Sequence, residues 1–241
     1  MADNGQPGGK LDLARVEAAI SELCARHSGL VTFDADGVLW RGDVGDSFLL
    51  WQIENHRLLP AVEREARQTF EAYRQGQFGD FKMAVFCATC LRGLSEEAVD
   101  ADARAFFDRE FRPRIIPETR AWARRLQSAG IDVWIVSGSH RWIVGAGARA
   151  VGIREECILP VAAEVRDGLV TSEVLLPVTY GEGKAQAIRH RLGRPPQLAL
   201  GNTLADRFML ELAQLPIAIE PDEGLSALAA ERGWPILKFQ V

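Results

Sequence analysis

Short apolar runs rich in β-branched residues alternate with helical patterns along most of the 241-residue chain, and this alternation restricts the possible folds more than any other feature. Strands separated by helix-length segments predict βαβ units, in which parallel strands share one sheet and the connecting helices cover both of its faces. We therefore predict an α/β fold built on a parallel sheet. The expected strands are residues 30–33, 131–136, 198–200, 217–219 and 236–239.

Helical periodicity occupies the segments between these strands, and a glycine follows most of them. Glycine is favoured directly after a helix because it adopts the left-handed conformation at little cost. The Asp167-Gly168 pair between strand-like residues is typical of a tight turn and predicts a β-hairpin within residues 163–176. The expected helices are residues 117–129, 141–151, 184–192, 205–212 and 225–232, and the helix-ending glycines are Gly130, Gly152, Gly193 and Gly233.

Residues 42–113 break the alternation. Their apolar residues recur at spacings of three and four through four successive helical periods, and no run resembles a strand. An all-helical cap domain inserted between the first and second strands explains this pattern. The α/β core then comprises residues 11–41 and 114–241, and the Gly-, Asn- and Asp-rich residues 1–10 are expected to form a flexible tail.

The composition is that of an ordinary globular protein, with 47% apolar residues, 25% charged residues and a formal net charge of −5. Nucleic acid is not an expected partner, because binding a polyphosphate backbone requires a surplus of Lys and Arg. No membrane partner is expected either, since the apolar runs fall far short of the ~20 residues that a membrane helix requires. Four cysteines do not make a disulfide framework in a chain this long, and no signal-peptide pattern is present, so we expect a cytoplasmic protein. The sequence indicates no particular oligomeric state.

Two carboxylates follow the first predicted strand in "VTFDADGVLW". Asp34 and Asp36 are two residues apart, so in an extended segment their side chains point the same way, and Gly37 allows the backbone to turn directly afterwards. Ligands of open α/β sheets bind at this end of the strands. Two close carboxylates repel each other, so the pair favours a site beside a cation, with one acid ionised and the other able to carry a proton. The alternative is that both acids cap a turn.

Further polar residues occur at the ends of later predicted strands or at the start of a helix. Ser137 closes the apolar run of "VWIVSGSH", Lys184 opens a helix in "GEGKAQAI", and Asn202 and Asp206 follow the strand in "GNTLADRFML". Taken alone, Ser137 is more simply a strand-ending hydroxyl and Lys184 a solvated lysine. Their order and their matching places in the topology give them weight.

These four motifs, with a helical segment between the first and the second, resemble the haloacid dehalogenase superfamily, and within it the phosphatases with a helical C1-type cap that are similar to phosphoserine phosphatase. The resemblance extends from about residue 30 to residue 241. It implies a Rossmann-like core with an inserted helical cap. It also implies a Mg²⁺-dependent phosphatase that hydrolyses a small-molecule phosphomonoester through an aspartyl-phosphate.

The resemblance assigns a role to each motif residue. Asp34 would be the nucleophile, and Asp36 the general acid and then the base. Ser137 would donate a hydrogen bond to a phosphoryl oxygen, and Lys184 would neutralise charge on the phosphoryl group and on Asp34. Mg²⁺ would bind the residues of the metal set, and the substrate would contact the residues of the substrate set. The metal set is Asp34, Asp36 through its carbonyl, Asn202, and Asp206 directly or through a water molecule. The substrate set is Asp43, as reader of an amine, and Gly138.

One position departs from the family pattern. Relatives usually have aspartate directly after the glycine of the fourth motif, where this chain has Asn202. An amide oxygen can ligate Mg²⁺ but carries no formal charge, so we expect weaker metal binding. Two alternatives therefore stand beside the phosphatase: a non-catalytic protein that binds a phospho-ligand, and a phosphate mutase of the same superfamily. Asp43 has its own alternative, an acid favoured at a helix N-terminus.

Four other features do not by themselves indicate a second functional site. The "GAGARA" segment matches a dinucleotide fingerprint but leaves no room for the strand that should precede it, so close helix packing accounts for it. Cys87 and Cys90 form a C-x-x-C pair with no second pair and no nearby histidine, which favours packing over metal binding. His140 could edge the site because it lies close to Ser137. Trp40 could line the same cleft or belong to the core.

Overall fold

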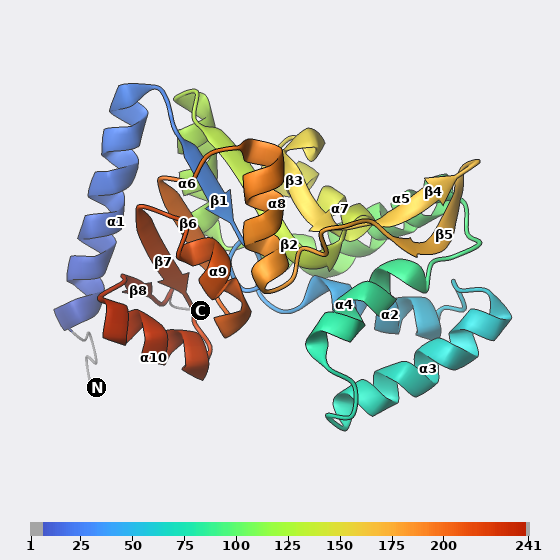
Figure 1. Cartoon of the computed structure of the whole chain (residues 1–241). Coiled ribbons are helices and arrows are strands. Elements are labelled where there is room, and N and C mark those ends of the chain that lie inside the picture. Colours follow the sequence, from blue (N-terminus) through green and yellow to red (C-terminus); the bar gives the residue numbers. More distant parts are fainter. Residues whose placement is uncertain (1–6, 240–241) are drawn as a thin grey trace.

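A computed structural model describes residues 7–239, and a six-stranded sheet in the order β3-β2-β1-β6-β7-β8 forms its centre (Figure 1). All neighbouring strands pair in parallel, as the alternation in the sequence predicts. The strands are β1 (Leu30–Phe33), β2 (Asp132–His140), β3 (Ile158–Val161), β6 (Leu198–Gly201), β7 (Leu215–Ile219) and β8 (Ile236–Leu237).

Helices cover both faces of this sheet. Successive strand residues point to opposite faces, so Leu198 and Leu200 join one apolar cluster while Ala199 between them joins the other. The first cluster holds the residues of α1, α6 and α7, and the second those of α8, α9 and α10 (Figure 1). These helices are α1 (Pro7–Arg26), α6 (Pro117–Ser128), α7 (Arg141–Val151), α8 (Glu182–Leu192), α9 (Arg207–Leu210) and α10 (Glu223–Arg232).

The segment between β1 and α6 is helical, as predicted, and no strand occurs within residues 42–113, all of which the structure describes. We call residues 42–113 the cap and propose that they form a separate domain. The cap helices are α2 (Val44–Glu54), α3 (Pro60–Arg74), α4 (Asp80–Thr89) and α5 (Glu96–Phe106), followed by a π-helical turn (Phe107–Phe111) and a 3-10 turn (Arg112–Arg114).

The predicted hairpin is present as β4 (Ala163–Arg166) and β5 (Leu169–Val174). Its two turn residues, Asp167 and Gly168, have φ angles of 52° and 76°, as a tight hairpin turn requires. The hairpin attaches to the cap by its backbone, because the Gly93 N–H donates to the Val170 carbonyl at 2.8 Å and the Val170 N–H donates to the Leu94 carbonyl at 2.9 Å. A hairpin from the second half of the chain therefore contacts the cap, and this contact was not predicted from the sequence.

The structure corrects several sequence-based boundaries. Residues 7–10, predicted as flexible tail, belong to α1, whose apolar face packs on the core; residues 1–6 of that predicted tail lie outside the described residues. β3 was not predicted, and β2 continues past Val136 to His140 because its polar end still pairs with β3. The helix expected over 205–212 is a 3-10 turn (Leu204–Asp206) followed by the short α9. Among residues 7–239, none of the helices combines the length and apolar character of a membrane span.

Candidate active site

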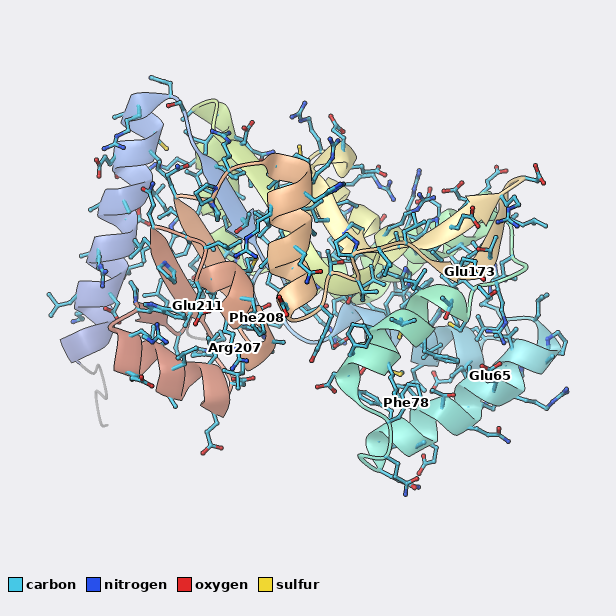
Figure 2. The ribbon with its side chains drawn as sticks, viewed as in Figure 1. Glu65, Phe78, Glu173, Arg207, Phe208 and Glu211 are labelled. Atoms are coloured by element: carbon cyan, nitrogen blue, oxygen red, sulfur yellow. The ribbon has the colours of Figure 1, made fainter. Side chains whose placement is uncertain are left out.

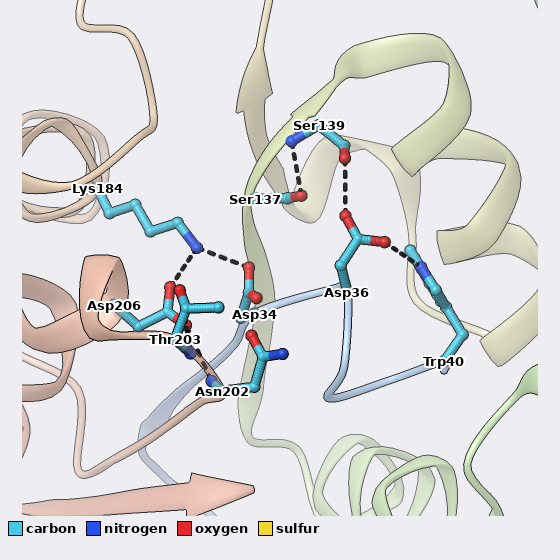
Figure 3. A network of polar contacts seen from close by, with 9 residues as sticks. All are labelled: Asp34, Asp36, Trp40, Ser137, Ser139, Lys184, Asn202, Thr203 and Asp206. Atoms are coloured by element: carbon cyan, nitrogen blue, oxygen red, sulfur yellow. Dashed lines mark hydrogen bonds and ion pairs between the residues drawn. The ribbon is translucent and has the colours of Figure 1, made fainter. Parts of the chain in front are cut away.

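The predicted site residues meet at the carboxyl ends of three adjacent strands (Figure 3). β1 lies between β2 and β6. Asp34 follows β1, Ser137 lies near the end of β2, and Asn202 follows β6. The Asp34 N–H donates to the Leu200 carbonyl at 2.8 Å, which continues the β1–β6 pairing and fixes the first aspartate at this edge. Lys184 reaches the same edge from the first turn of α8.

Lys184 joins two of the predicted carboxylates. Its Nζ donates to Asp34 Oδ1 at 2.6 Å and to Asp206 Oδ1 at 2.5 Å, and all three residues are 5% exposed or less. Burial raises the pKa of Asp34 to about 7, and the charge of Asp206 adds to this, while Lys184 opposes it. Burial lowers the pKa of Lys184, but the two carboxylates outweigh it and raise that pKa overall. The lysine is therefore a permanent cation beside Asp34.

Asp206 holds both the lysine and the loop after β6. Its Oδ2 accepts hydrogen bonds from the backbone N–H groups of Asn202 at 2.9 Å and Thr203 at 3.0 Å. A Cβ at Gly201 would lie 2.6 Å from the Cβ of Asp206, so a glycine is required for this close approach. Both oxygens of Asp206 thus already accept bonds from the chain, and its first role is to orient Lys184 and the Asn202 backbone.

Asp36 is held by three donors. Oδ1 accepts from the Trp40 indole N–H at 2.7 Å, and Oδ2 accepts from the Ser139 hydroxyl at 2.7 Å (Figure 3). Oδ1 also accepts from the Val44 N–H at 2.8 Å. Burial raises the pKa of Asp36 well above its usual range, and the charges of nearby aspartates add to this effect. The donated hydrogen bonds act in the opposite direction. Asp36 is therefore suited to carry a proton near neutral pH.

The loop at the end of β2 divides into buried and cavity-lining residues. Ser137 is 1% exposed, and its hydroxyl oxygen accepts a hydrogen bond from the Ser139 N–H at 3.1 Å. Gly138 and Ser139 line the cavity described next. A Cβ at Gly138 would lie 3.2 Å from the Tyr180 ring, so the absence of a side chain there allows the tyrosine to cover the loop.

A cavity of about 750 Å³ lies between this edge of the core and the cap. Asp34, Asp36 and Lys184 line it, together with residues of the cap helices α2, α3 and α4. Arg207 and Phe208 stand on its core side (Figure 2). The cavity is large enough for a small metabolite and opens directly onto the carboxylates.

The cap contributes a group of acids to this cavity. Asp43, predicted as a substrate reader, caps α2 by accepting from the Asp46 N–H at 2.8 Å, and it also lines the cavity, so the helix-cap interpretation is confirmed and the substrate-reading role stays a prediction. Asp46 and Asp80 lie on the same wall. Burial raises the pKa of Asp46 to about 7, with the charges of Asp43 and Asp80 adding to it.

Two tyrosines meet on Asp80. Tyr73 donates to Asp80 Oδ1 at 3.1 Å from the cap, and Tyr180 donates to Asp80 Oδ2 at 3.2 Å from the loop before α8. Sequence reasoning did not identify these tyrosines, Asp46 or Asp80. Their spacing carries no motif: Tyr73, Asp46 and Asp80 reach the cavity through the packing of the cap helices, and Tyr180 reaches it from the loop before α8.

Ser139 was also missed, although the sequence contained a signal for it. It lies two residues after Ser137, so an extended backbone turns both side chains the same way. Trp40, for which both a core and a cleft position were open, is fully buried, and its indole N–H donates to Asp36.

His140 and the cysteines have structural roles. His140 packs between Phe48 and Trp142, with ring centroids 5.6 Å and 5.7 Å away, and burial lowers its pKa to about 3. It is therefore a neutral core residue. Cys87 and Cys90 are buried and unbridged in and just after α4, and Cys87 forms part of the cavity wall.

The site contains oxygen atoms that can serve as ligands of Mg²⁺. Asn202 places its amide against Gly37, where a Cβ would lie 1.9 Å from Nδ2, so the amide lies beside the backbone that follows Asp36 and near Asp34 (Figure 3). Within residues 7–239, no three His, Cys, Asp or Glu side chains are grouped as a metal site. One carboxylate, an amide oxygen and a backbone carbonyl fit a hard ion that keeps several waters.

Residues 31–211 match the model of the haloacid dehalogenase-like hydrolase family. The chain belongs to this family. Solved structures with a similar fold include a protein of unknown function from Bordetella pertussis Tohama I, with a TM-score of 0.76 and 23% identity over 86% of this chain and 97% of that one. A substrate-bound phosphoserine phosphatase has a TM-score of 0.56 and 19% identity, over 83% of this chain and 90% of that one.

Proteins with similar sequences include several that are named as phosphatases. A probable phosphatase from Mycobacterium tuberculosis is 41% identical over 46% of this chain and 39% of its own length. A phosphoserine phosphatase from the same species is 30% identical over 63% of this chain and 50% of its length. This chain thus spans about half the length of these relatives or less. A histidinol-phosphatase from Neisseria meningitidis is 27% identical over 88% of this chain and 99% of its length.

Proposed function

We propose that the protein is a Mg²⁺-dependent phosphatase that hydrolyses a small-molecule phosphomonoester through an aspartyl-phosphate on Asp34. The observation that supports this most is the position of Lys184, whose Nζ lies 2.6 Å from Asp34 Oδ1 at the floor of a cavity that also holds Asp36. A fixed cation beside a carboxylate attracts an anionic phosphoryl group to that carboxylate and reduces the repulsion between them.

In the first step, an oxygen of Asp34 attacks phosphorus, and the bond between phosphorus and the ester oxygen breaks. The departing alkoxide is a poor leaving group, so Asp36 gives it a proton. The raised pKa of Asp36 supports this role, because a protonated carboxyl is needed before the step. Lys184 and the loop at Ser137 and Gly138 would bind the phosphoryl oxygens.

In the second step, Asp36, now ionised, takes a proton from a water molecule. The water oxygen attacks phosphorus, the acyl-phosphate bond breaks, and Asp34 is restored as a carboxylate. One residue thus acts as acid and then as base, which returns the site to its starting protonation state.

Asp34, Asn202 and the Asp36 carbonyl would hold Mg²⁺. The ion would supply positive charge to the phosphoryl oxygens when bound. Asp206 was predicted to hold the metal directly or through a water molecule. Its oxygens accept hydrogen bonds from Lys184 and from the backbone of Asn202 and Thr203, so we propose that it acts on the metal indirectly, by supporting Lys184 and the loop of Asn202.

Asn202→Asp should lower the Mg²⁺ concentration that gives half-maximal rate. A charged ligand in a partly solvated site adds about 1–2 kcal/mol of attraction, or roughly 5- to 30-fold in that concentration. Asn202→Ala, which removes the amide oxygen, should raise it. A metal titration of the three proteins on one substrate gives the order Asp, Asn, Ala if the loop binds the metal. Equal midpoints for all three would exclude Asn202 as a ligand.

We further propose that the substrate carries a cationic group. Asp43, Asp46 and Asp80 line the cavity on the cap side, opposite the phosphoryl-binding residues. Two relatives are named for phosphoserine and histidinol phosphate, esters that carry an ammonium group. A positive group near the cap acids would relieve their mutual repulsion.

Asp43→Asn should reduce the preference for phosphoserine and phosphocholine over a neutral ester such as glycerol phosphate by roughly tenfold, the equivalent of about 1.4 kcal/mol. Asparagine caps a helix as well as aspartate does, so α2 should remain intact. The ratio of kcat/KM values measures this preference, and Asp167→Asn at the hairpin turn is the matched control. If the ranking of esters does not change, Asp43 is a helix cap and no more.

A screen of phosphomonoesters with and without Mg²⁺ tests the proposed function. We expect release of inorganic phosphate that depends on the metal. Formation of an isomeric phosphate ester without release would instead indicate a mutase. Binding of a phosphate analogue with no turnover of any ester would indicate a non-catalytic binding protein.

A further inference from the structure

We propose that Ser139 is the positioning residue for the acid Asp36 and that its hydroxyl fixes the oxygen from which the proton is delivered. This proposal rests on the acid role proposed above for Asp36. It starts from the hydrogen bond of 2.7 Å that the Ser139 hydroxyl donates to Asp36 Oδ2 (Figure 3). Ser139 itself lines the catalytic cavity.

The three donors on Asp36 differ in what they can do. The Trp40 indole and the Val44 backbone amide, which both bond Oδ1, can only donate a hydrogen bond. A proton on Oδ1 would therefore lie against the hydrogens of the indole N–H and the backbone N–H, neither of which can accept a hydrogen bond. The Ser139 hydroxyl can donate to an ionised carboxylate or accept from a protonated one. Oδ2 is thus the oxygen that can carry the proton, and Ser139 can stay bonded to it before and after proton transfer.

The hydroxyl of Ser139 has little freedom to leave this position. Its own backbone N–H is held by the Ser137 hydroxyl at 3.1 Å. On the cap side, a Cβ at Gly45 would lie 2.8 Å from the Ser139 hydroxyl oxygen. Gly45 is the second residue of α2 and has a helical backbone, which alanine also adopts. An alanine at this position would therefore crowd the Ser139 hydroxyl without disturbing the helix. Ser139 therefore links the core, the acid and the start of the cap.

The test compares kcat/KM for two kinds of ester, because this ratio reports the steps up to departure of the leaving group. An alkyl phosphomonoester requires a proton on its leaving oxygen, whereas p-nitrophenyl phosphate scarcely does. Part of the acid contribution, typically ~10²–10⁴-fold, should be lost when the acid is no longer oriented, so Ser139→Ala should lower kcat/KM for the alkyl ester by roughly 10- to 100-fold. The value for p-nitrophenyl phosphate should change by less than about threefold, at the scale of a lost neutral contact.

Three further variants exclude a merely structural effect. Ser139→Thr keeps the hydroxyl and should restore most of the alkyl-ester activity. Gly45→Ala should reduce that activity in the wild-type chain but have little further effect in the Ser139→Ala chain, because the two changes act on one contact. Ser21→Ala, an exposed serine on α1, is the control. Inhibition by inorganic phosphate should be unchanged in every variant if the phosphoryl site is intact.

Asp36→Asn separates failure of this proposal from failure of the proposed function. Asp36→Asn could lower kcat/KM for the alkyl ester alone, while Ser139→Ala lowers kcat/KM equally for both esters or changes neither value. In that case Asp36 is the acid and Ser139 does not position it. If Asp36→Asn shows no difference between the two esters, the acid role fails and the proposal fails with it. Equal losses from Gly45→Ala in both backgrounds would also contradict the proposed contact.

Discussion

Asp34→Asn should abolish turnover, with a loss of at least ~10³-fold in kcat, the scale expected when a covalent nucleophile is removed. The amide has nearly the same shape as the carboxylate but cannot form the acyl-phosphate. Lys184 would keep its second partner, Asp206, at 2.5 Å, so the lysine should stay in place. Asp167→Asn in the exposed hairpin turn is the matched control and should keep full activity. Turnover within about tenfold of the unchanged protein would exclude Asp34 as the nucleophile.

The same variant should not lose stability. Burial raises the pKa of Asp34 to about 7, above its ordinary value of 3.8, so the folded state binds this proton more tightly than the unfolded state does. Stability from this group is therefore present at low pH and falls as the pH rises from about 4 to about 7. Asparagine cannot ionise, so the variant should be at least as stable as the unchanged protein at pH 8 without Mg²⁺. Thermal unfolding of both proteins at pH 5 and pH 8 measures the difference.

Lys184→Met should damage both catalysis and stability. The lysine stands between two buried carboxylates, and removing one partner of a buried ion pair costs about 3–5 kcal/mol because a charge remains unpaired. Loss of the cation at the reacting group should also lower kcat by roughly 10²–10³-fold, as for other fixed groups that stabilise a transition state. Urea unfolding and steady-state kinetics measure the two effects, and Lys82→Met on the exposed face of α4 is the control.

A second substitution tests the cause of the lost stability. Asp206→Asn removes one of the two carboxylates, so Lys184→Met combined with Asp206→Asn should be more stable than Lys184→Met alone. It should not recover activity, since the cation is still missing. If the double variant is no more stable than the single one, repulsion between Asp34 and Asp206 is not what destabilises Lys184→Met.

Much of the core could be predicted because its strands are buried on both faces. Leu30–Phe33 is apolar or β-branched at every position and fully buried, and its predicted bounds agree with β1. The predicted bounds of α7 also agree at both ends, and its C-terminal end is set by Gly152 in the left-handed conformation. β3 was missed since Pro160 is unfavourable in most strands, but β3 lies at the edge of the sheet, where a proline is tolerated.

The long helix α1 was missed although its pattern was present. Val16, Ile20 and Leu23 are buried and follow the three- and four-residue spacing of an amphipathic helix. The polar end of β2 could not be predicted in the same way. The register is irregular after Val136, and pairing with β3 resumes at His140, opposite Val161; a tertiary contact of this kind leaves no apolar periodicity in the sequence.

The candidate site also contains residues that could be predicted from the sequence and residues that could not. Asp34, Asp36, Lys184 and Asn202 could be predicted because each follows a strand or opens a helix, and parallel strands bring those positions to one edge. Asp46 and Asp80 could not, because their place in the cavity depends on how the cap helices pack. The residues proposed to bind the phosphoryl group are therefore placed by the topology, and the cap residues proposed to select the substrate are placed by helix packing.

Chemical trapping of the covalent intermediate tests the account most directly. The protein is mixed with Mg²⁺ and its best substrate, quenched in acid during turnover and reduced with borohydride, which converts an aspartyl-phosphate to homoserine. Mass spectrometry of the peptides then locates the change. We expect homoserine at position 34, only when substrate is present. Substrate hydrolysis with unmodified Asp34, or with the modification at another residue, would contradict the proposed mechanism.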